Sequence, residues 1–130
     1  MGFDSVKAGP DLPAIKVLVV EDEPILLLFA TDVVEEAGYE AISAANADDA
    51  IKILMARDDI SIVFTDVRMP GSMDGMKLAT FIRDRWPPIE IIVTSGHLGA
   101  APPDLPARGK FFRKPYRTQH VIDALHEMAH

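Results

Sequence analysis

The sequence contains no cysteine among its 130 residues, which excludes disulfide bonds and thiolate metal sites. Long apolar runs are also missing, because the longest, at 25–30 and 91–93, are far shorter than the roughly 18 residues of a membrane span. No basic segment followed by a hydrophobic one begins the chain, and Val6 stands where a myristoylation signal needs Ser or Thr. We therefore expect a soluble, cytoplasmic protein that does not bind a membrane.

Basic residues are few. The chain has 13 Lys and Arg against 20 Asp and Glu, so its formal net charge is −7. This charge has the wrong sign for binding a phosphate backbone, and the sequence shows no local basic patch. We therefore expect no direct contact with nucleic acid.

The apolar content, 48% of the residues, is that of one globular domain. Residues 1–13 have no periodic apolar pattern and contain two prolines and two glycines, so they are predicted to form a flexible N-terminal tail. The folded domain is predicted to cover residues 14–130. A chain of this length buries roughly two-thirds of the surface that its unfolded form exposes, and it needs no cross-links.

Short apolar runs alternate with amphipathic segments along the predicted domain. The runs predict β-strands at 16–20, 40–44, 61–66, 90–94 and 111–113. The amphipathic segments predict helices at 24–37, 47–57, 75–85 and 118–128. Pro24 suits the first turn of a helix, Asn46 can cap the second helix, and Gly38 is predicted as the C-cap of the first. Residues 98–109 contain three prolines, so a helix there is predicted to be short or irregular.

This alternation is typical of an α/β fold with a parallel sheet and one layer of helices on each face. We predict a doubly wound, flavodoxin-like sheet of five strands in the order 2-1-3-4-5, in which strands one and three are neighbours. Glu21 and Asp22 then end one of these strands, and Asp66 ends the other. Two carboxylates about 4 Å apart repel by about 4 kcal/mol at an effective dielectric of 20, so three of them need protons or a cation.

Oxygen ligands without His or Cys favour Mg²⁺, or Mn²⁺, over softer metals. Taken singly, however, Glu21 and Asp22 are also common at the start of a helix, and Asp66 is common in a turn. Lys114 and Ser95 follow two further strands and bring a cation and a hydroxyl to the same sheet edge. Each has an ordinary alternative, an exposed lysine or a turn serine. Together these residues favour a site for a transferring phosphoryl group.

At this point the sequence resembles the receiver domain of two-component response regulators, over about residues 14–130. The resemblance rests on Val-Glu-Asp-Glu at 20–23, Asp66 followed by Met69-Pro70 and Asp74-Gly75, Ser95-Gly96 and Lys114-Pro115. It implies that Asp66 takes a phosphoryl group from a histidine kinase or a histidine phosphotransfer protein. The resemblance also implies that Mg²⁺ is held by Glu21, Asp22, Asp66 and the Arg68 carbonyl. It implies that Lys114 and Ser95 contact the phosphate, and that Ser95 and Phe111 are the residues that move in the switch.

The sequence departs from the family pattern in three places. The loop between Pro70 and Asp74 is one residue longer than usual, and the Pro-rich segment 98–109 replaces a helix of the usual output face. Thr94 competes with Ser95 for the hydroxyl role, and Ser95 is favoured because a small residue follows it. Thr94, Arg68 and His97 are expected at the rim of the site, where Arg68 and His97 would tune the lifetime of the phosphoryl group.

Several functions are compatible with this resemblance. We expect a stand-alone regulator that signals through another protein, because no output module is expected after the last helix. It would catalyse at most its own slow phosphorylation and dephosphorylation. A phosphate shuttle or sink is the main alternative, and a homodimer is left open. A haloacid-dehalogenase-type phosphatase would need an acid where Arg68 stands. A flavodoxin-like cofactor site is disfavoured because the acids at 21–23 would repel the phosphate group of the cofactor.

Overall fold

In the computed structural model, the described residues are 15–68, 71, 73–96 and 105–129. They contain one parallel sheet with the strand order β2-β1-β3-β4-β5, as the sequence predicted. The strands are β1 (Lys16–Val20), β2 (Glu40–Ala44), β3 (Ile60–Asp66), β4 (Glu90–Ser95) and β5 (Lys110–Arg113). The last three strands are each one residue longer than predicted, because backbone pairing extends one residue further at one end of each.

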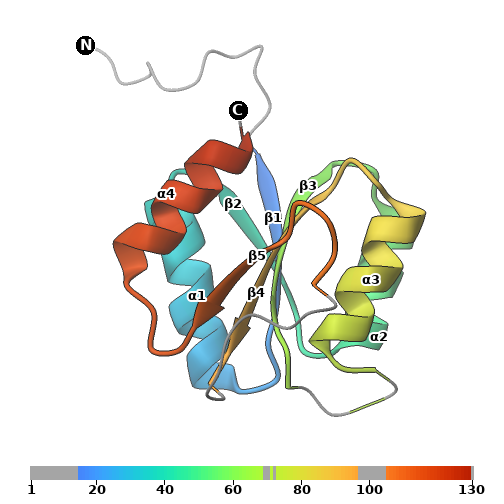
Figure 1. Ribbon diagram of the computed structural model, residues 1–130, viewed down its shortest axis with the longest axis horizontal. Helices are drawn as coiled ribbons and strands as arrows, with labels where there is room; N and C mark the ends of the chain where they lie inside the picture. The colour runs from blue at the N-terminus through green and yellow to red at the C-terminus, as the bar shows by residue number, and fades with distance from the viewer. Residues whose placement is uncertain (1–14, 69–70, 72, 97–104, 130) are drawn as a thin grey trace.

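Among the described residues, two helices cover each face of the sheet (Figure 1). The helices α1 (Pro24–Glu36) and α4 (Thr118–Ala129) lie together on one face, and α2 (Ala47–Ala56) and α3 (Gly75–Arg85) lie on the other. Each layer hides one face of the sheet from water, which explains why the central strands are apolar at nearly every position. The predicted doubly wound α/β architecture is confirmed.

Alternate side chains of each strand enter different cores. Ile91 and Val93 of β4 pack under α2 and α3, whereas Ile92 packs under α1 and α4. Val63 and Phe64 of β3 divide in the same way, and none of these five side chains is more than 3% exposed. The two cores therefore hold the carboxyl ends of β1, β3 and β4 firmly in register.

Local signals in the sequence account for the helix ends. Asn46 accepts a hydrogen bond from the Asp49 amide, at 2.8 Å, and so caps α2 as predicted. The predicted C-cap of α1 was wrong by one residue: the cap is Ala37, and Gly38 follows it with φ +99°. Glycine is common at this next position because it reaches the left-handed conformation without a Cβ clash.

The segment before β5 contains no helix over residues 105–109, which agrees with the predicted irregularity there. The Arg83 guanidinium group links this segment to the residues that connect α3 with β4. Arg83 of α3 donates to the Ala107 carbonyl at 3.0 Å and to the Pro87 and Ile89 carbonyls at 2.6 and 2.7 Å. The predictions for the tail at 1–13 and for residues 98–104 lie outside the described residues.

No helix in the described part of the chain combines the length and the apolar character that crossing a bilayer requires.

Candidate functional site

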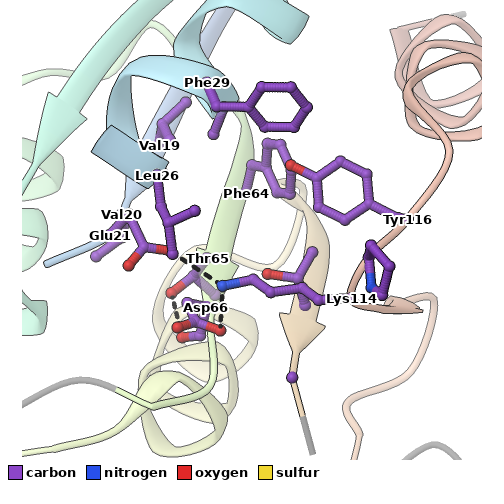
Figure 2. Close-up of a pocket in the computed structure, with 14 residues that line it drawn as sticks. Val19, Val20, Glu21, Leu26, Phe29, Phe64, Thr65, Asp66, Lys114 and Tyr116 are labelled. Carbon is purple, nitrogen blue, oxygen red and sulfur yellow. Dashed lines mark hydrogen bonds and ion pairs between the residues drawn. The ribbon is translucent and has the colours of Figure 1, made fainter. Parts of the chain in front are cut away.

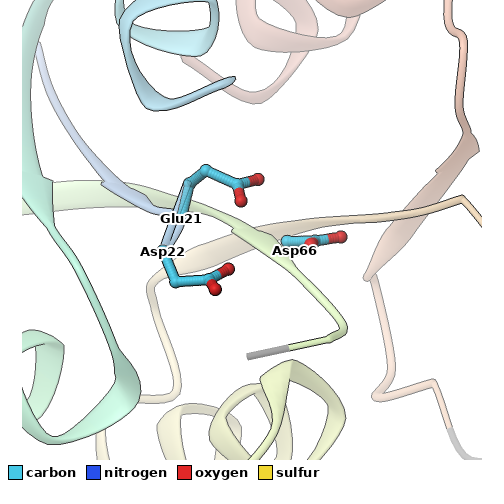
Figure 3. Close-up of side chains that lie close together, drawn as sticks. All are labelled: Glu21, Asp22 and Asp66. Carbon is cyan, nitrogen blue, oxygen red and sulfur yellow. The ribbon is translucent and has the colours of Figure 1, made fainter. Parts of the chain in front are cut away.

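Three carboxylates meet at the carboxyl edge of the sheet. The pairing of Val20 with Thr65 places the next residues, Glu21 just after β1 and Asp66 at the end of β3, beside each other. One oxygen each of Glu21, Asp22 and Asp66 lies within 4.8 Å of the other two (Figure 3). The predicted neighbourhood of these acids is therefore present.

The two inner carboxylates of the cluster are buried. Glu21 is 5% exposed and Asp66 is 8% exposed, while Asp22 is the most exposed of the three. Burial raises the pKa of Glu21, and the Asp66 charge adds to this effect. Burial likewise raises the pKa of Asp66, although Lys114 opposes the shift. Both carboxylates are therefore held in a place that disfavours their ionised forms.

Lys114 supplies the positive charge of the site. Its Nζ lies 3.4 Å from Asp66 Oδ1 and 3.4 Å from Glu21 Oε1 (Figure 2). Its backbone amide donates to the Ser95 carbonyl at 2.8 Å. This bond to the end of β4 positions Lys114, which directly follows β5. The sequence predicted a lysine near Asp66, but it did not predict the second ion pair with Glu21.

The backbone around Asp66 is tightly packed. The Val67 amide donates to Asp66 Oδ1 at 3.0 Å, and the Gly75 amide donates to the Val67 carbonyl at 2.7 Å. A Cβ at Gly75 would stand 1.9 Å from the Asp66 carbonyl oxygen, a distance that no side chain tolerates. Gly75 was noted in the sequence as part of a motif, and the structure shows that its missing side chain makes room for the Asp66 backbone.

Thr94 and Ser95, the competing hydroxyl residues, are both buried at the end of β4. Thr94 lines a cavity together with Asp66 and Lys114. Strand alternation puts Ser95 on the other side, the side where Phe111 packs against the core under α2 and α3. The predicted phosphate contact and switch role of Ser95 and the rotamer change of Phe111 stay predictions.

The predicted rim of the site is only partly described. Arg68 lies two residues beyond Asp66 and is exposed, and its proposed carbonyl ligation and rim role stay predictions. His97 lies outside the described residues, and so do Met69 and Pro70.

A cavity of about 450 Å³ lies between the acid cluster and α1. It was not predicted from the sequence. The ring of Tyr116 lies on its wall, with its centroid 6.0 Å from that of Phe29 and 6.1 Å from that of Phe64. Burial raises the pKa of Tyr116 to about 12, and the charges of Glu21 and Asp66 act in the same direction. An aromatic residue directly after Lys114-Pro115 was the available sequence signal.

The donor set fits a hard divalent cation. All three groups of the cluster are carboxylates, which Mg²⁺ and Mn²⁺ prefer, and burial raises the pKa of both Glu21 and Asp66. A cation would relieve the mutual repulsion that Lys114 offsets only in part. The cluster can therefore hold such an ion.

The sequence model of the response regulator receiver domain matches residues 17–105. The chain belongs to this family. Among curated proteins, the receiver is 32% identical over 114 residues to the response regulator protein FleR of Pseudomonas aeruginosa. The aligned region covers 85% of this chain and 24% of FleR. It is 33% identical over 82 residues to the nitrogen assimilation regulatory protein NtrX of Azorhizobium caulinodans, which covers 62% of this chain and 18% of NtrX.

Solved receiver structures share the fold. A response regulator receiver protein from Sinorhizobium medicae is 28% identical, with a TM-score of 0.77 over 88% of this chain and 94% of that one. The response regulator TrrA of Thermotoga maritima, solved in complex with Mg²⁺ and BeF, has a TM-score of 0.79 at 23% identity. It covers 88% of this chain and 98% of its own.

The receiver spans about a quarter or less of the length of these two curated relatives. Family membership assigns it to response regulators of two-component signalling, whose receiver domains are generally phospho-acceptors rather than enzymes. This assignment favours the receiver interpretation over the haloacid-dehalogenase and flavodoxin alternatives.

Proposed function

We propose that this receiver accepts a phosphoryl group on Asp66 from a histidine kinase or phosphotransfer protein, in the presence of Mg²⁺, and then signals through a partner protein. The observation that carries the proposal is the position of Asp66. Its buried carboxylate lies within 4.8 Å of two others and 3.4 Å from the ammonium of Lys114. Membership of the receiver family also supports Asp66, at the end of β3, as the residue that accepts the phosphoryl group.

The residues divide the chemistry between them. Asp66 Oδ attacks the phosphorus atom while the bond from phosphorus to the imidazole nitrogen of the donor breaks; the electron pair stays on that nitrogen, and Asp66 keeps the phosphoryl group as an acyl phosphate. Lys114 is within reach to pair with a phosphoryl oxygen in place of the carboxylate that it now contacts. Glu21, Asp22, Asp66 and the Arg68 carbonyl would hold Mg²⁺, which would neutralise the negative charges of the carboxylates and the phosphoryl group.

The surface beside the site supports a protein as donor. Ile25, Leu28 and Phe29 of α1 are 80%, 62% and 47% exposed, although they are large apolar residues. Exposed apolar groups that gather in one place often mark an interaction surface. The first turns of α1 directly follow Glu21 and Asp22, so a partner bound there would reach Asp66. The cytoplasmic location and a homodimer stay predictions.

Phosphorylation can be tested with acetyl phosphate and Mg²⁺, followed by intact mass and peptide mapping. We expect one phosphoryl group, on Asp66, and no adduct in Asp66→Asn. Asp74→Asn is a matched control, because Asp74 belongs to the same loop region and its cap of α3 at the Lys77 amide survives the change. Equal labelling of Asp66→Asn and the parent protein would contradict the proposal.

A further inference from the structure

The cavity above Asp66 is larger than a phosphoryl group requires. Its volume of about 450 Å³ falls within the roughly 300–1,000 Å³ of sites that bind small organic molecules. One end is polar and holds Glu21, Asp66 and Lys114. The other end is apolar and is walled by Phe29, Phe64 and Tyr116. Figure 2 shows the ammonium of Lys114 between the carboxylates and the aromatic rings.

We propose that this cavity binds the organic part of a small-molecule phosphodonor, an acyl phosphate whose acyl group is apolar and larger than acetyl. The inference rests on the proposed phosphorylation of Asp66 and adds a substrate preference to it. The polar end would take the phosphoryl group beside Lys114, and the aromatic end would take the acyl group.

The two ends of the cavity suit the two ends of such a molecule. Lys114 is the only cation among its described lining residues, so an anionic head group is favoured at this point. Apart from Lys114 and the two carboxylates, the polar side chains of the described lining are the hydroxyl residues Thr65, Thr94 and Tyr116, which carry no charge at neutral pH. The Tyr116 ring contacts the rings of Phe29 and Phe64, and the three rings offer flat faces to an aryl or branched acyl group.

The transfer step is balanced without a proton or another reactant. A carboxylate oxygen of Asp66 forms a bond to phosphorus while the bond from phosphorus to the acyl oxygen breaks. The electron pair of the broken bond leaves with the acyl oxygen, so the products are the aspartyl phosphate and a free carboxylate. Charge is conserved because one carboxylate is consumed and one is released.

The test compares acetyl phosphate with benzoyl phosphate, two donors that release carboxylates of similar acidity. At equal subsaturating concentrations we expect Asp66 to be labelled about tenfold faster by benzoyl phosphate, the scale that an apolar pocket gives for a small increase in buried surface. We also expect benzylphosphonate, which cannot transfer its phosphoryl group, to slow labelling by acetyl phosphate more strongly than methylphosphonate does.

Two variants locate the effect. Ala30→Phe fills the cavity from α1, and Phe29→Ala removes an aromatic wall whose side chain is half exposed, so the second change places little demand on folding. Each should lower the ratio of benzoyl to acetyl rates. Met55→Ala is the control, because Met55 is also exposed and apolar but lies on α2, across the sheet, and the ratio should not change.

The possible failures differ from one another. If both donors label Asp66 at equal rates and benzylphosphonate has no advantage, the acyl preference is wrong while the phosphorylation site stands. If neither donor labels Asp66, the proposed function fails and this inference fails with it. If Phe29→Ala slows transfer only from a phosphohistidine protein, the cavity serves a protein side chain, and the inference is overturned.

Discussion

Lys114 cannot balance the charge of the site alone. The cluster holds three carboxylates, and Lys114 contacts two of them, so the formal charge of the four groups is −2. Unpaired buried charge is costly because the protein interior solvates ions poorly. The site therefore favours binding a cation or a proton, which would reduce this uncompensated negative charge.

We predict that Lys114→Ala strengthens Mg²⁺ binding or leaves it nearly unchanged, while it reduces the conformational response to phosphorylation. The variant removes a positive charge from beside the metal ligands, and Lys114 is not itself a metal ligand. Mg²⁺ titration followed by amide NMR measures the first effect, and chemical-shift changes after labelling of Asp66 measure the second.

Lys110→Ala is the matched control, since Lys110 also belongs to the β5 region but pairs with Glu127 on α4. It should change neither measurement. Markedly weaker Mg²⁺ binding in Lys114→Ala would mean that this lysine supports the fold of the site instead of opposing the metal.

We also predict that Asp66→Asn stabilises the fold at pH 7 without metal. Burial raises the folded-state pKa of Asp66, so its ionised form costs stability at every pH above that value. The cost disappears below the unfolded pKa of about 3.9, where the carboxyl is protonated in both states. The melting temperature of Asp66→Asn should therefore exceed that of the parent by a few degrees at pH 7, and the gap should close toward pH 4.

Thermal unfolding followed by circular dichroism at both pH values tests this expectation. The exposed Asp84 on α3 provides a control, and Asp84→Asn should leave the melting temperature nearly unchanged. A parent protein that melts higher than Asp66→Asn at pH 7 would show that the ion pair with Lys114 outweighs burial.

At the scale of elements, the strands were the most predictable part of the fold. The runs that form β1 and β3 are short, apolar and bounded by charged residues, and this pattern leaves few alternatives to buried parallel strands. The start of α2 was equally clear because the capping side chain of Asn46 could be recognised, whereas the cap that Asp74 provides for α3 was not predicted. Because strand order decides which strand ends meet, Glu21, Asp22 and Asp66 could be placed together from the sequence.

The cavity could not be predicted because α1 is apolar around much of its circumference. Its run of Ile, Leu and Phe at 25–29 gives no single stripe, so periodicity does not tell which side chains enter the core, line a cavity or face water. In the structure Leu26 lines the cavity, while Leu28 is 62% exposed. The ion pair between Lys114 and Glu21 was hidden for a similar reason, since it depends on the path of the chain after β5.

We predict that Gly75→Ala damages both stability and metal binding. The added Cβ would overlap the Asp66 carbonyl oxygen, so α3 and the end of β3 must move apart. Overpacking of this kind costs about 1–3 kcal/mol, and displacement of Asp66 should weaken Mg²⁺ binding. Gly96→Ala is a useful comparison for stability, because a Cβ there meets no atom of the described residues within 4 Å. Equal denaturation midpoints for the two variants would contradict the prediction.

At the scale of the whole molecule, the acid cluster and the exposed apolar residues of α1 lie at the same end of the sheet. The amino-terminal turn of α1 follows directly from β1, so the chain brings both features together over residues 20–29. The opposite helix layer carries one large, strongly exposed apolar side chain, Met55, among its described residues. This asymmetry favours α1 as the surface on which a phosphodonor protein binds.

The last prediction tests that surface. Leu28→Ser should slow phosphotransfer from a phosphorylated histidine kinase or phosphotransfer protein by about tenfold, the loss expected when a central apolar contact of an interface is removed. Labelling by acetyl phosphate should not change, because Leu28 is outside the described lining of the cavity. Met55→Ser is the matched control, since Met55 and Leu28 are both 62% exposed on opposite sides of the sheet. The experiment is a phosphotransfer profile of the three proteins against the kinases of the source organism. Slower transfer to Met55→Ser, with Leu28→Ser unaffected, would place the donor on the α2 side and reject α1 as its binding surface.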